Sequence, residues 1–368
     1  MRLIKKSWTP LNPLLKRIEI MPNALNHFFR LYIFSLFSAI IFLSSCFHAK
    51  DYNKKNIAKN DTLTFQIDSI SQLIDEHPAK AELYNVRANL FLKKQLPENA
   101  LQDISKALSI DSSKAMFYVS KSEIYFALGK MDSSLYAVHK ALSLDNTNKT
   151  ALYKAAEFYF YLKKYDDVSE YISRLLEIDK NNSPAYLLLG MAQKESGDTE
   201  KAIKNFQNTL LADNNNFEAN LQLGLIYASR KNTLAESYYK NALNLHSGSV
   251  EALYALGMYY QENEDFDKSI ETYKKIISIN PKFKFAKYNI GYIYLVYQNN
   301  YQEAKKYFTD AIQADSLYAE AFYNRGYCNE LLHLFPEATS DYKKALALKK
   351  IYKKVEEGLK RLEKNRPK

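Results

Sequence analysis

The sequence predicts an all-α chain built from about eight copies of one helical hairpin. Residues 250–283 show the unit most clearly, because apolar residues recur at helical spacing in two segments that flank a polar turn at 263–267. Asn280-Pro281 then ends the second segment, since proline lacks an N–H and disfavours helical geometry in the residue before it. The pattern recurs at a period of about 34 residues, which indicates an α-solenoid in which each hairpin covers its neighbour.

The eighth place of the unit is occupied by a small residue in every copy. These residues are Ala88, Ser122, Ala156, Gly190, Gly224, Gly257, Gly291 and Gly326. The twentieth place is also small except at Val168, and the twenty-seventh place is alanine in most copies. A glycine in mid-helix costs about 1 kcal/mol relative to alanine, so repeated glycine at one place indicates a close approach of two helices.

The small places, the period and the aromatic residues at the fourth and eleventh places together resemble the tetratricopeptide repeat. The resemblance implies a right-handed superhelical α-solenoid, in which the first helices line a concave side that binds peptides or protein surfaces. The full repeats are then 81–114, 115–148, 149–182, 183–216, 217–249, 250–283, 284–318 and 319–352. Residues 62–80 predict a half-repeat without its first helix, and residues 353–368 predict a basic capping helix and tail.

Residues 1–45 have the layout of a secretory signal, with a basic segment, the apolar run LYIFSLFSAIIFL and then small residues. The ending Leu43-Ser44-Ser45-Cys46 resembles the lipobox of bacterial lipoproteins. That resemblance implies an acylated Cys46 and a periplasm-facing place at the outer membrane, with Met21 as an alternative start. An uncleaved signal anchor is the alternative, because the apolar run is only slightly shorter than the ~17–25 residues that span a bilayer. Residues 46–61 are polar and predict a flexible tether.

Charge and motif content argue against nucleic-acid binding, metal binding and catalysis. Residues 349–368 hold nine Lys/Arg and three Glu, and the repeats themselves are nearly neutral, so no basic stripe follows the array. The six histidines are scattered, and the chain has no phosphate loop, nucleophile elbow or H-E-x-x-H motif. We expect no cofactor and no metal, acidic residues mostly on helix surfaces and turns, and a buried Cys328.

Candidate partner-binding residues lie at the fifth, sixth and ninth places of repeats six to eight, which the resemblance turns toward the concave side. They are Tyr254, Met258, Tyr288, Asn289, Tyr292, Tyr323, Asn324 and Tyr327. Tyrosine gives a large contact area at low entropic cost, and asparagine can bond a peptide backbone through both ends of its amide. The alternative is that these side chains pack against one another between hairpins. A second possible groove holds Phe126, Tyr153, Phe160 and Tyr161.

Two functions remain open from the sequence. The first is a membrane-anchored scaffold or adaptor that binds a protein or peptide in a bacterial envelope, similar to envelope lipoproteins of the same repeat family. The second is a glycan-binding or cell-wall-enzyme accessory protein held by an uncleaved anchor. An adaptor for C-terminal carboxylates is disfavoured, because Lys154 is the only basic residue at the fifth and sixth places.

Overall fold

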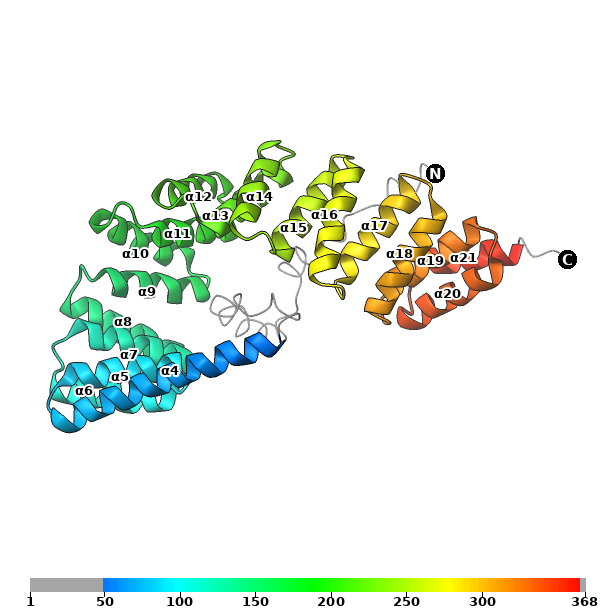
Figure 1. The fold of residues 1–368 in the computed structure, drawn as a ribbon. Coiled ribbons are helices and arrows are strands. Elements are labelled where there is room, and N and C mark those ends of the chain that lie inside the picture. Colours follow the sequence, from blue (N-terminus) through cyan, green and yellow to red (C-terminus); the bar gives the residue numbers. More distant parts are fainter. Residues whose placement is uncertain (1–48, 365–368) are drawn as a thin grey trace. The chain divides into compact units, whose positions relative to one another are not determined.

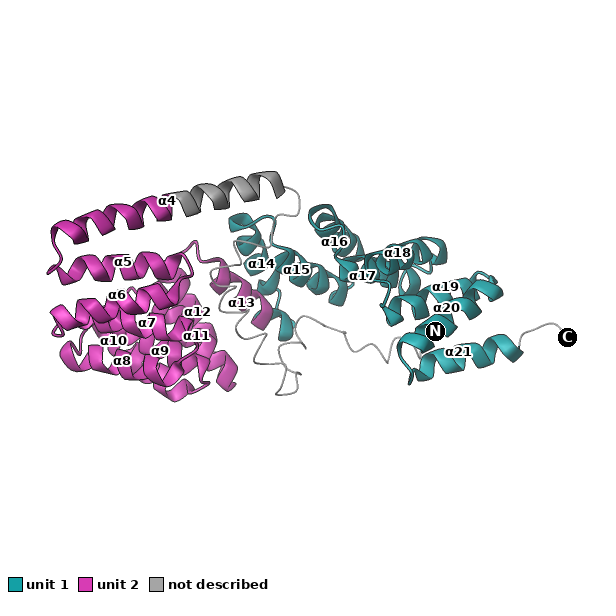
Figure 2. Ribbon diagram, turned by 90° about the horizontal axis from the view of Figure 1, so that it is seen from below, with its two compact units in different colours: residues 1–46, 227–368 teal, residues 47–226 magenta. Residues whose placement is uncertain are grey.

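The computed structural model describes residues 49–364, with side chains from Thr62 onward, and every regular element in this range is an α-helix (Figure 1). The all-α prediction is therefore confirmed. The described residues divide along the chain into two compact units, with the boundary between Ile226 and Tyr227 inside α13 (Phe217–Ser229) (Figure 2). In chain order we call residues up to 226 the first unit (magenta, unit 2 in the key of Figure 2) and residues from 227 onward the second unit (teal, unit 1 in the key). The predicted signal of residues 1–45 and the predicted lipidation site Cys46 lie outside the described residues.

The first unit is a stack of helical hairpins that begins with the single helix α4 (Ala49–Glu76). Its hairpins are α5 (Ala81–Lys93) with α6 (Pro97–Ile110), α7 (Ala115–Ala127) with α8 (Met131–Leu144), α9 (Lys149–Tyr161) with α10 (Tyr165–Ile178), and α11 (Ser183–Ser196) with α12 (Thr199–Ala212). Each hairpin contacts the next, so each helix pair buries the apolar face of its neighbour.

The second unit continues the same pattern through three complete hairpins. After α14 (Leu234–Leu245) come α15 (Val250–Glu262) with α16 (Phe266–Ile279), α17 (Lys284–Val296) with α18 (Tyr301–Ala314), and α19 (Ala319–Leu331) with α20 (Phe335–Leu348). The final helix, α21 (Lys353–Lys364), packs on α20 and α19 through Val355, Gly358 and Leu362. Its remaining residues are mostly exposed and charged, as expected of a helix that caps a stack.

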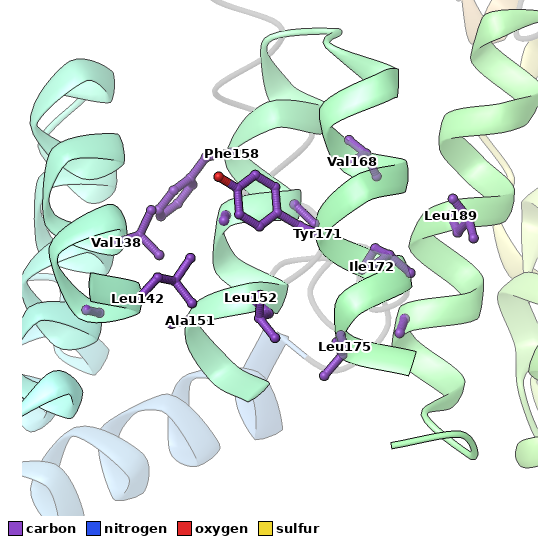
Figure 3. Packing of buried hydrophobic residues seen from close by; sticks show 14 of the residues in the cluster. Val138, Leu142, Ala151, Leu152, Phe158, Val168, Tyr171, Ile172, Leu175 and Leu189 are labelled. Atoms are coloured by element: carbon purple, nitrogen blue, oxygen red, sulfur yellow. The ribbon is translucent and has the colours of Figure 1, made fainter. Parts of the chain in front are cut away.

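One core cluster of the first unit extends over several hairpins, from α7 to α11. Figure 3 shows Val138 of α8, Phe158 of α9, Ile172 of α10 and Leu189 of α11 within one cluster. Val138 and Ile172 are fully buried, and alanines between these large side chains allow the helices to approach. Burial of apolar surface contributes about 25 cal/mol per Å², so a hairpin gains stability only when its neighbours cover it.

A left-handed residue lies in every turn that joins the first and second helices of a repeat. These residues are Gln95, Gly129, Lys163, Gly197, Lys231, Glu264, Asn299 and His333, with φ between 52° and 92°. The following amide closes the turn by donating to a carbonyl in the last turn of the helix, as Leu96 N does to Phe91 O at 2.9 Å. This bond helps to offset the roughly 1–2 kcal/mol that a non-glycine residue loses in this conformation.

The start of α4 differs from the predicted tether of residues 46–61. Helix α4 begins at Ala49 and includes most of that segment, whereas the predicted half-repeat began at residue 62. Ile67 and Ile74 of α4 are buried, and α4 packs on α5 as the second helix of a hairpin would. Residues 49–76 contain no proline or glycine, so a helix fixed by its packed end can extend at one backbone hydrogen bond per residue.

Candidate partner-binding surface

The predicted surface lies on α15, α17 and α19, and the eighth-place glycine sets how each of these helices meets its second helix. An ideal Cβ at Gly257 would lie 2.6 Å from Cε1 of Tyr273. The equivalent distances are 3.0 Å between Gly291 and Phe308 and 2.9 Å between Gly326 and Tyr342. The aromatic ring of the second helix therefore occupies the space that a larger residue would need.

The residue of the second helix that faces the eighth place is larger where the eighth residue is smaller. Gly190 in the first unit also meets a ring, that of Phe206, at 2.8 Å from its ideal Cβ. Where the eighth place is alanine or serine, the corresponding place of the second helix is aliphatic. These pairs are Ala88 with Ile104, Ser122 with Val138 and Ala156 with Ile172. The large residue at the twenty-fourth place thus varies with the small residue at the eighth, a match that the small places alone do not predict.

Five of the eight predicted partner-binding residues contact one another between hairpins. The Asn289 amide nitrogen donates to the hydroxyls of Tyr254 at 3.3 Å and Tyr273 at 3.0 Å, and it contacts Met258 Sδ at 3.4 Å. Tyr254 and Met258 are buried, and burial raises the pKa of Tyr254 to about 12. These bonds join α17 to the preceding hairpin.

The same arrangement recurs one repeat later. The Asn324 amide nitrogen donates to Tyr288 Oη at 2.8 Å, and Asn324 is buried while Tyr288 is half-buried. The fifth-place tyrosine of one repeat thus accepts from the sixth-place asparagine of the next repeat. We call Tyr254, Asn289, Tyr288 and Asn324 the amide ladder. Its geometry matches the alternative left open by the sequence, in which these side chains pack between hairpins.

The remaining predicted residues form a stacked tyrosine row on α17 and α19. Tyr323 and Tyr327 stack with ring centroids 6.4 Å apart and an interplanar angle of 6°. Tyr292 stacks with Tyr288 at 6.4 Å. Tyr323 and Tyr327 are half-buried, and among the described residues the structure gives neither hydroxyl a hydrogen-bond partner. We call Tyr323 and Tyr327 the open pair.

The electrostatics of the open pair favour neutral hydrogen-bond donors. Burial raises the pKa of Tyr323 to about 12 and also raises the pKa of Tyr327, although Arg361 acts in the opposite direction on both. The Arg361 guanidinium lies 5.8 Å from the Tyr327 ring centroid and is bonded to Glu330. Both hydroxyls therefore stay protonated at neutral pH and can donate to a carbonyl of a bound chain.

The second predicted groove lies in the first unit, where two of its four aromatic residues, Phe126 and Tyr161, contact each other. Phe126 stacks on Phe158 at 5.2 Å and meets the edge of Tyr161 at 5.6 Å. Beside them, Lys154 Nζ lies 2.7 Å from Glu123 and 2.9 Å from Glu157. Burial lowers the pKa of Lys154, but these two carboxylates more than offset it and hold the pKa above its ordinary value. Lys154 is thus already paired.

Two aspartates, Asp103 and Asp341, are buried in ion pairs and are exceptions to the expectation that acidic residues lie mostly on helix surfaces and turns. Asp103 accepts from Arg87 Nε and Nη2 at 2.7 and 2.8 Å, and Arg87 also donates to Ser71 Oγ at 3.0 Å. Asp103 is buried because a bidentate guanidinium satisfies it within the hairpin. Arg87 thereby joins α5 to both α4 and α6.

The last repeat carries the same pair at the same two places. Asp341 accepts from Arg325 Nε and Nη2 at 2.9 and 2.6 Å and from Asn329 at 3.0 Å, and Arg325 also reaches Thr309 Oγ1 at 3.4 Å. An arginine at the seventh place and an aspartate at the twenty-third place recur only in the first and last repeats. That recurrence is the signal in the sequence by which these pairs could have been found.

Other groups offer little chemistry in the part of the chain that the structure describes. No group of three His, Cys, Asp or Glu side chains there could hold a metal ion. Cys328 is fully buried, and burial raises the pKa of its thiol to about 12. Within residues 49–364, no helix has both the length and the apolar character needed to cross a membrane.

The hairpin stack, the glycine–ring contacts and the amide ladder define a helical-repeat scaffold. Family models described as tetratricopeptide repeat match residues 81–114, 183–216, 250–283 and 293–350. The chain belongs to the tetratricopeptide repeat family, whose members are typically non-catalytic scaffolds for protein–protein interaction.

Individual relatives are distant. The uncharacterized protein ycf37 of Pyropia yezoensis is 35% identical over 88 residues, which cover 23% of this chain and about half (49%) of that protein. A tetratricopeptide repeat protein from Parabacteroides merdae is 18% identical, with a TM-score of 0.47 over 68% of this chain and 98% of that one. Pseudomonas aeruginosa pilF is 19% identical, with a TM-score of 0.49 over 55% of this chain and 92% of that one. None of these likenesses identifies what this chain binds.

Proposed function

We propose that this chain is a membrane-anchored tetratricopeptide repeat scaffold that binds a protein or peptide partner in a bacterial envelope. The observation that carries the proposal is the open pair, Tyr323 and Tyr327, whose half-buried rings are stacked and whose hydroxyls have no partner among the described residues. Tyr323 is held from behind by the rings of Tyr342 and Tyr352, at 5.9 and 5.3 Å. A rigid aromatic surface of this kind binds at low entropic cost.

The amide ladder takes a supporting role in this proposal. In this ladder the amide nitrogens of Asn289 and Asn324 donate to the hydroxyls of Tyr254 and Tyr288. These bonds fix the spacing of α15, α17 and α19. A partner would then meet an ordered surface and would not have to order it on binding. The partner would bind through stacking and hydrogen bonds, and salt would have little effect on its affinity.

Removing both hydroxyls of the open pair should weaken partner binding without weakening the fold. We expect Tyr323→Phe with Tyr327→Phe to lose about 2 kcal/mol of binding free energy, because each hydroxyl hydrogen bond contributes about 1 kcal/mol. The rings and their packing remain. A photoreactive residue at position 327 identifies the partner in living cells, and calorimetry with that purified partner then measures the loss.

Tyr136→Phe supplies the control, since Tyr136 is 74% exposed on α8 of the other unit. It should bind the partner like the unaltered chain. Wild-type affinity in the Tyr323/Tyr327 double variant would show that the partner binds elsewhere, and the groove of Phe126 and Tyr161 would be tested next. Tyr288→Ala is a poor probe, because it also removes a bond between two hairpins.

Membrane anchoring rests on the sequence around Cys46. We expect Cys46→Ala to leave an uncleaved precursor or to release the protein into the soluble fraction. Each buried CH₂ of an acyl chain contributes about 0.8 kcal/mol, and stable anchoring takes more than one such signal. Fractionation of cells and mass spectrometry of the N-terminus would measure both outcomes. Normal processing and full membrane retention of this variant would exclude the lipoprotein.

A glycan-binding accessory protein with an uncleaved anchor is the second candidate, and one groove in the first unit favours it. A cavity of about 310 Å³ between α7 and α8 is lined by Tyr118, Tyr125 and Tyr136 together with Lys121 and Asp132. Tyrosine faces and nearby polar groups suit a sugar ring. Tyr136→Ala should then lower retention on immobilised peptidoglycan at least about tenfold, as expected when one aromatic anchor is lost. Equal retention of Tyr136→Ala and the unaltered chain on peptidoglycan would exclude glycan binding in this groove.

A further inference from the structure

The connection between α20 and α21 lies within a lysine-rich segment at the end of the second unit (Figure 2). Residues 343–354 contain six lysines and no acidic residue. Lys343, Lys344, Lys350, Lys353 and Lys354 are exposed, and no ion pair is found for them within residues 49–364. Lys349 is the exception, because it bonds to Glu320 at 3.1 Å. Five positive charges therefore face solvent within twelve residues.

Ile351 lies at the centre of these charges and is 87% exposed. A single exposed aliphatic residue is ordinary on a protein surface, but this one directly follows Lys349 and Lys350, and Lys353 and Lys354 follow after Tyr352. The solvating role of a capping helix accounts for the lysines and gives no reason for an exposed isoleucine among them. The combination of an apolar centre with a cationic rim is the composition of a segment that lies on a membrane.

The backbone on both sides of Ile351 is fixed by packing. Tyr352 packs against Tyr323 with ring centroids 5.3 Å apart and the rings tilted by 42°, and Val355 is fully buried. Lys349 N donates to Ala345 O at 3.0 Å and so closes the end of α20, while Val355 N donates to Tyr352 O at 2.9 Å. With both flanks held, Ile351 is presented outward by an ordered turn, and docking would order little more of the chain.

We propose that this connection, residues 349–354 with Lys343 and Lys344, docks on an anionic membrane surface. Ile351 would enter the headgroup region, and the lysines would lie over anionic headgroups within the Debye length of roughly 8–10 Å. A nucleic acid would use the same positive charge but would gain nothing from an exposed isoleucine. The contact uses neither the N-terminal anchor nor the hydroxyls of the open pair, although Tyr352 of this connection packs against Tyr323.

An environment-sensitive fluorophore at Ile351→Cys would test the contact in the full chain carrying Cys46→Ser. Cys328 is fully buried, so the introduced thiol is the one that reacts. We expect a blue shift of emission with vesicles of 30% phosphatidylglycerol in phosphatidylcholine, no shift with phosphatidylcholine alone, and loss of the shift in 0.5 M NaCl. Lys350→Gln, Lys353→Gln and Lys354→Gln together should raise the lipid concentration at half-shift about a hundredfold, since each lysine contributes roughly fivefold.

Two matched controls make the result specific. The same fluorophore at Leu317→Cys should show no shift, because Leu317 is 72% exposed in the preceding connection between hairpins without a lysine cluster. The charge-matched variant is Lys106→Gln, Lys130→Gln and Lys140→Gln in the first unit, and it should keep the half-shift concentration. Four outcomes would each overturn the proposal. The first two are no emission shift at position 351 and an equal emission shift at position 317. The others are an unchanged half-shift lipid concentration in the Lys350/Lys353/Lys354 variant and an emission shift with duplex DNA in place of vesicles.

Discussion

Replacing Gly257 with alanine should lower the free energy of unfolding by about 1–3 kcal/mol. Helix propensity alone would predict a gain in stability, because it favours alanine over glycine by about 1 kcal/mol. The cause is contact, because an ideal Cβ at this position lies 2.6 Å from the Tyr273 ring, closer than real Cβ atoms come. The ring cannot simply withdraw, since its hydroxyl is bonded to Gln261 at 3.0 Å and to Asn289 at 3.0 Å. Urea denaturation and hydrogen exchange of the α15 and α16 amides would measure the loss.

A control and a rescue make this prediction specific to the ring. Gly248→Ala should change stability by less than about 0.5 kcal/mol, because nothing lies within 4 Å of its ideal Cβ. Tyr273→Ile in the Gly257→Ala background should recover part of the loss, since it recreates the Ala88 with Ile104 combination of the first repeat. Additive effects of the two substitutions would show that the glycine and the ring do not interact.

The repeat architecture could be predicted from the sequence because it depends on local patterns. Helical spacing, small eighth places and the proline that ends a hairpin at Asn280-Pro281 are each visible without knowledge of neighbours in space. Turn conformation is only partly visible in the sequence, because Gly129 and Gly197 are the glycines among these left-handed residues and the others, such as Gln95 and Glu264, are not glycine. Their conformation comes from a backbone hydrogen bond that any residue type can make.

The candidate surface was harder to predict because the same residues can serve two purposes. A tyrosine at the fifth place can face a ligand or an asparagine of the next repeat, and the residue at the sixth place of that next repeat decides which. Tyr288 therefore lies in the amide ladder, while Tyr323, at the same place one repeat later, has no following asparagine and meets Tyr352 instead.

Buried charge was missed for a related reason. An aspartate on a helix is usually solvated, so Asp103 and Asp341 attract no notice until an arginine at the seventh place is considered with each of them. A charged side chain is buried at low cost only when its partners are fixed around it. Those partners come from three different helices in each case, with Ser71 joining one pair and Thr309 the other.

Asp341→Ala should lower the free energy of unfolding by about 2–3 kcal/mol. Removing one member of a buried ion pair costs roughly 3–5 kcal/mol, and the lower figure follows because the Arg325 side chain is 22% exposed while that of Asp341 is 7% exposed. The substitution leaves two guanidinium donors and the Asn329 amide without their acceptor. Urea denaturation would measure the loss, and hydrogen exchange should locate it in α19 and α20.

Glu337→Ala on the same helix is the control, because Glu337 is exposed and should change stability by no more than about 0.5 kcal/mol. Arg325→Met with Asp341→Leu should lose much less than Asp341→Ala alone, since an apolar pair of similar volume often replaces a buried ion pair at little cost. Asp103→Ala in the first repeat should reproduce the loss, because Arg87 is held in the same way and its side chain is 20% exposed. Equal free energies of unfolding for Asp341→Ala and Glu337→Ala would contradict this prediction. They would mean that water solvates the Arg325 guanidinium once Asp341 is removed, so that the ion pair does not stabilise the last hairpin.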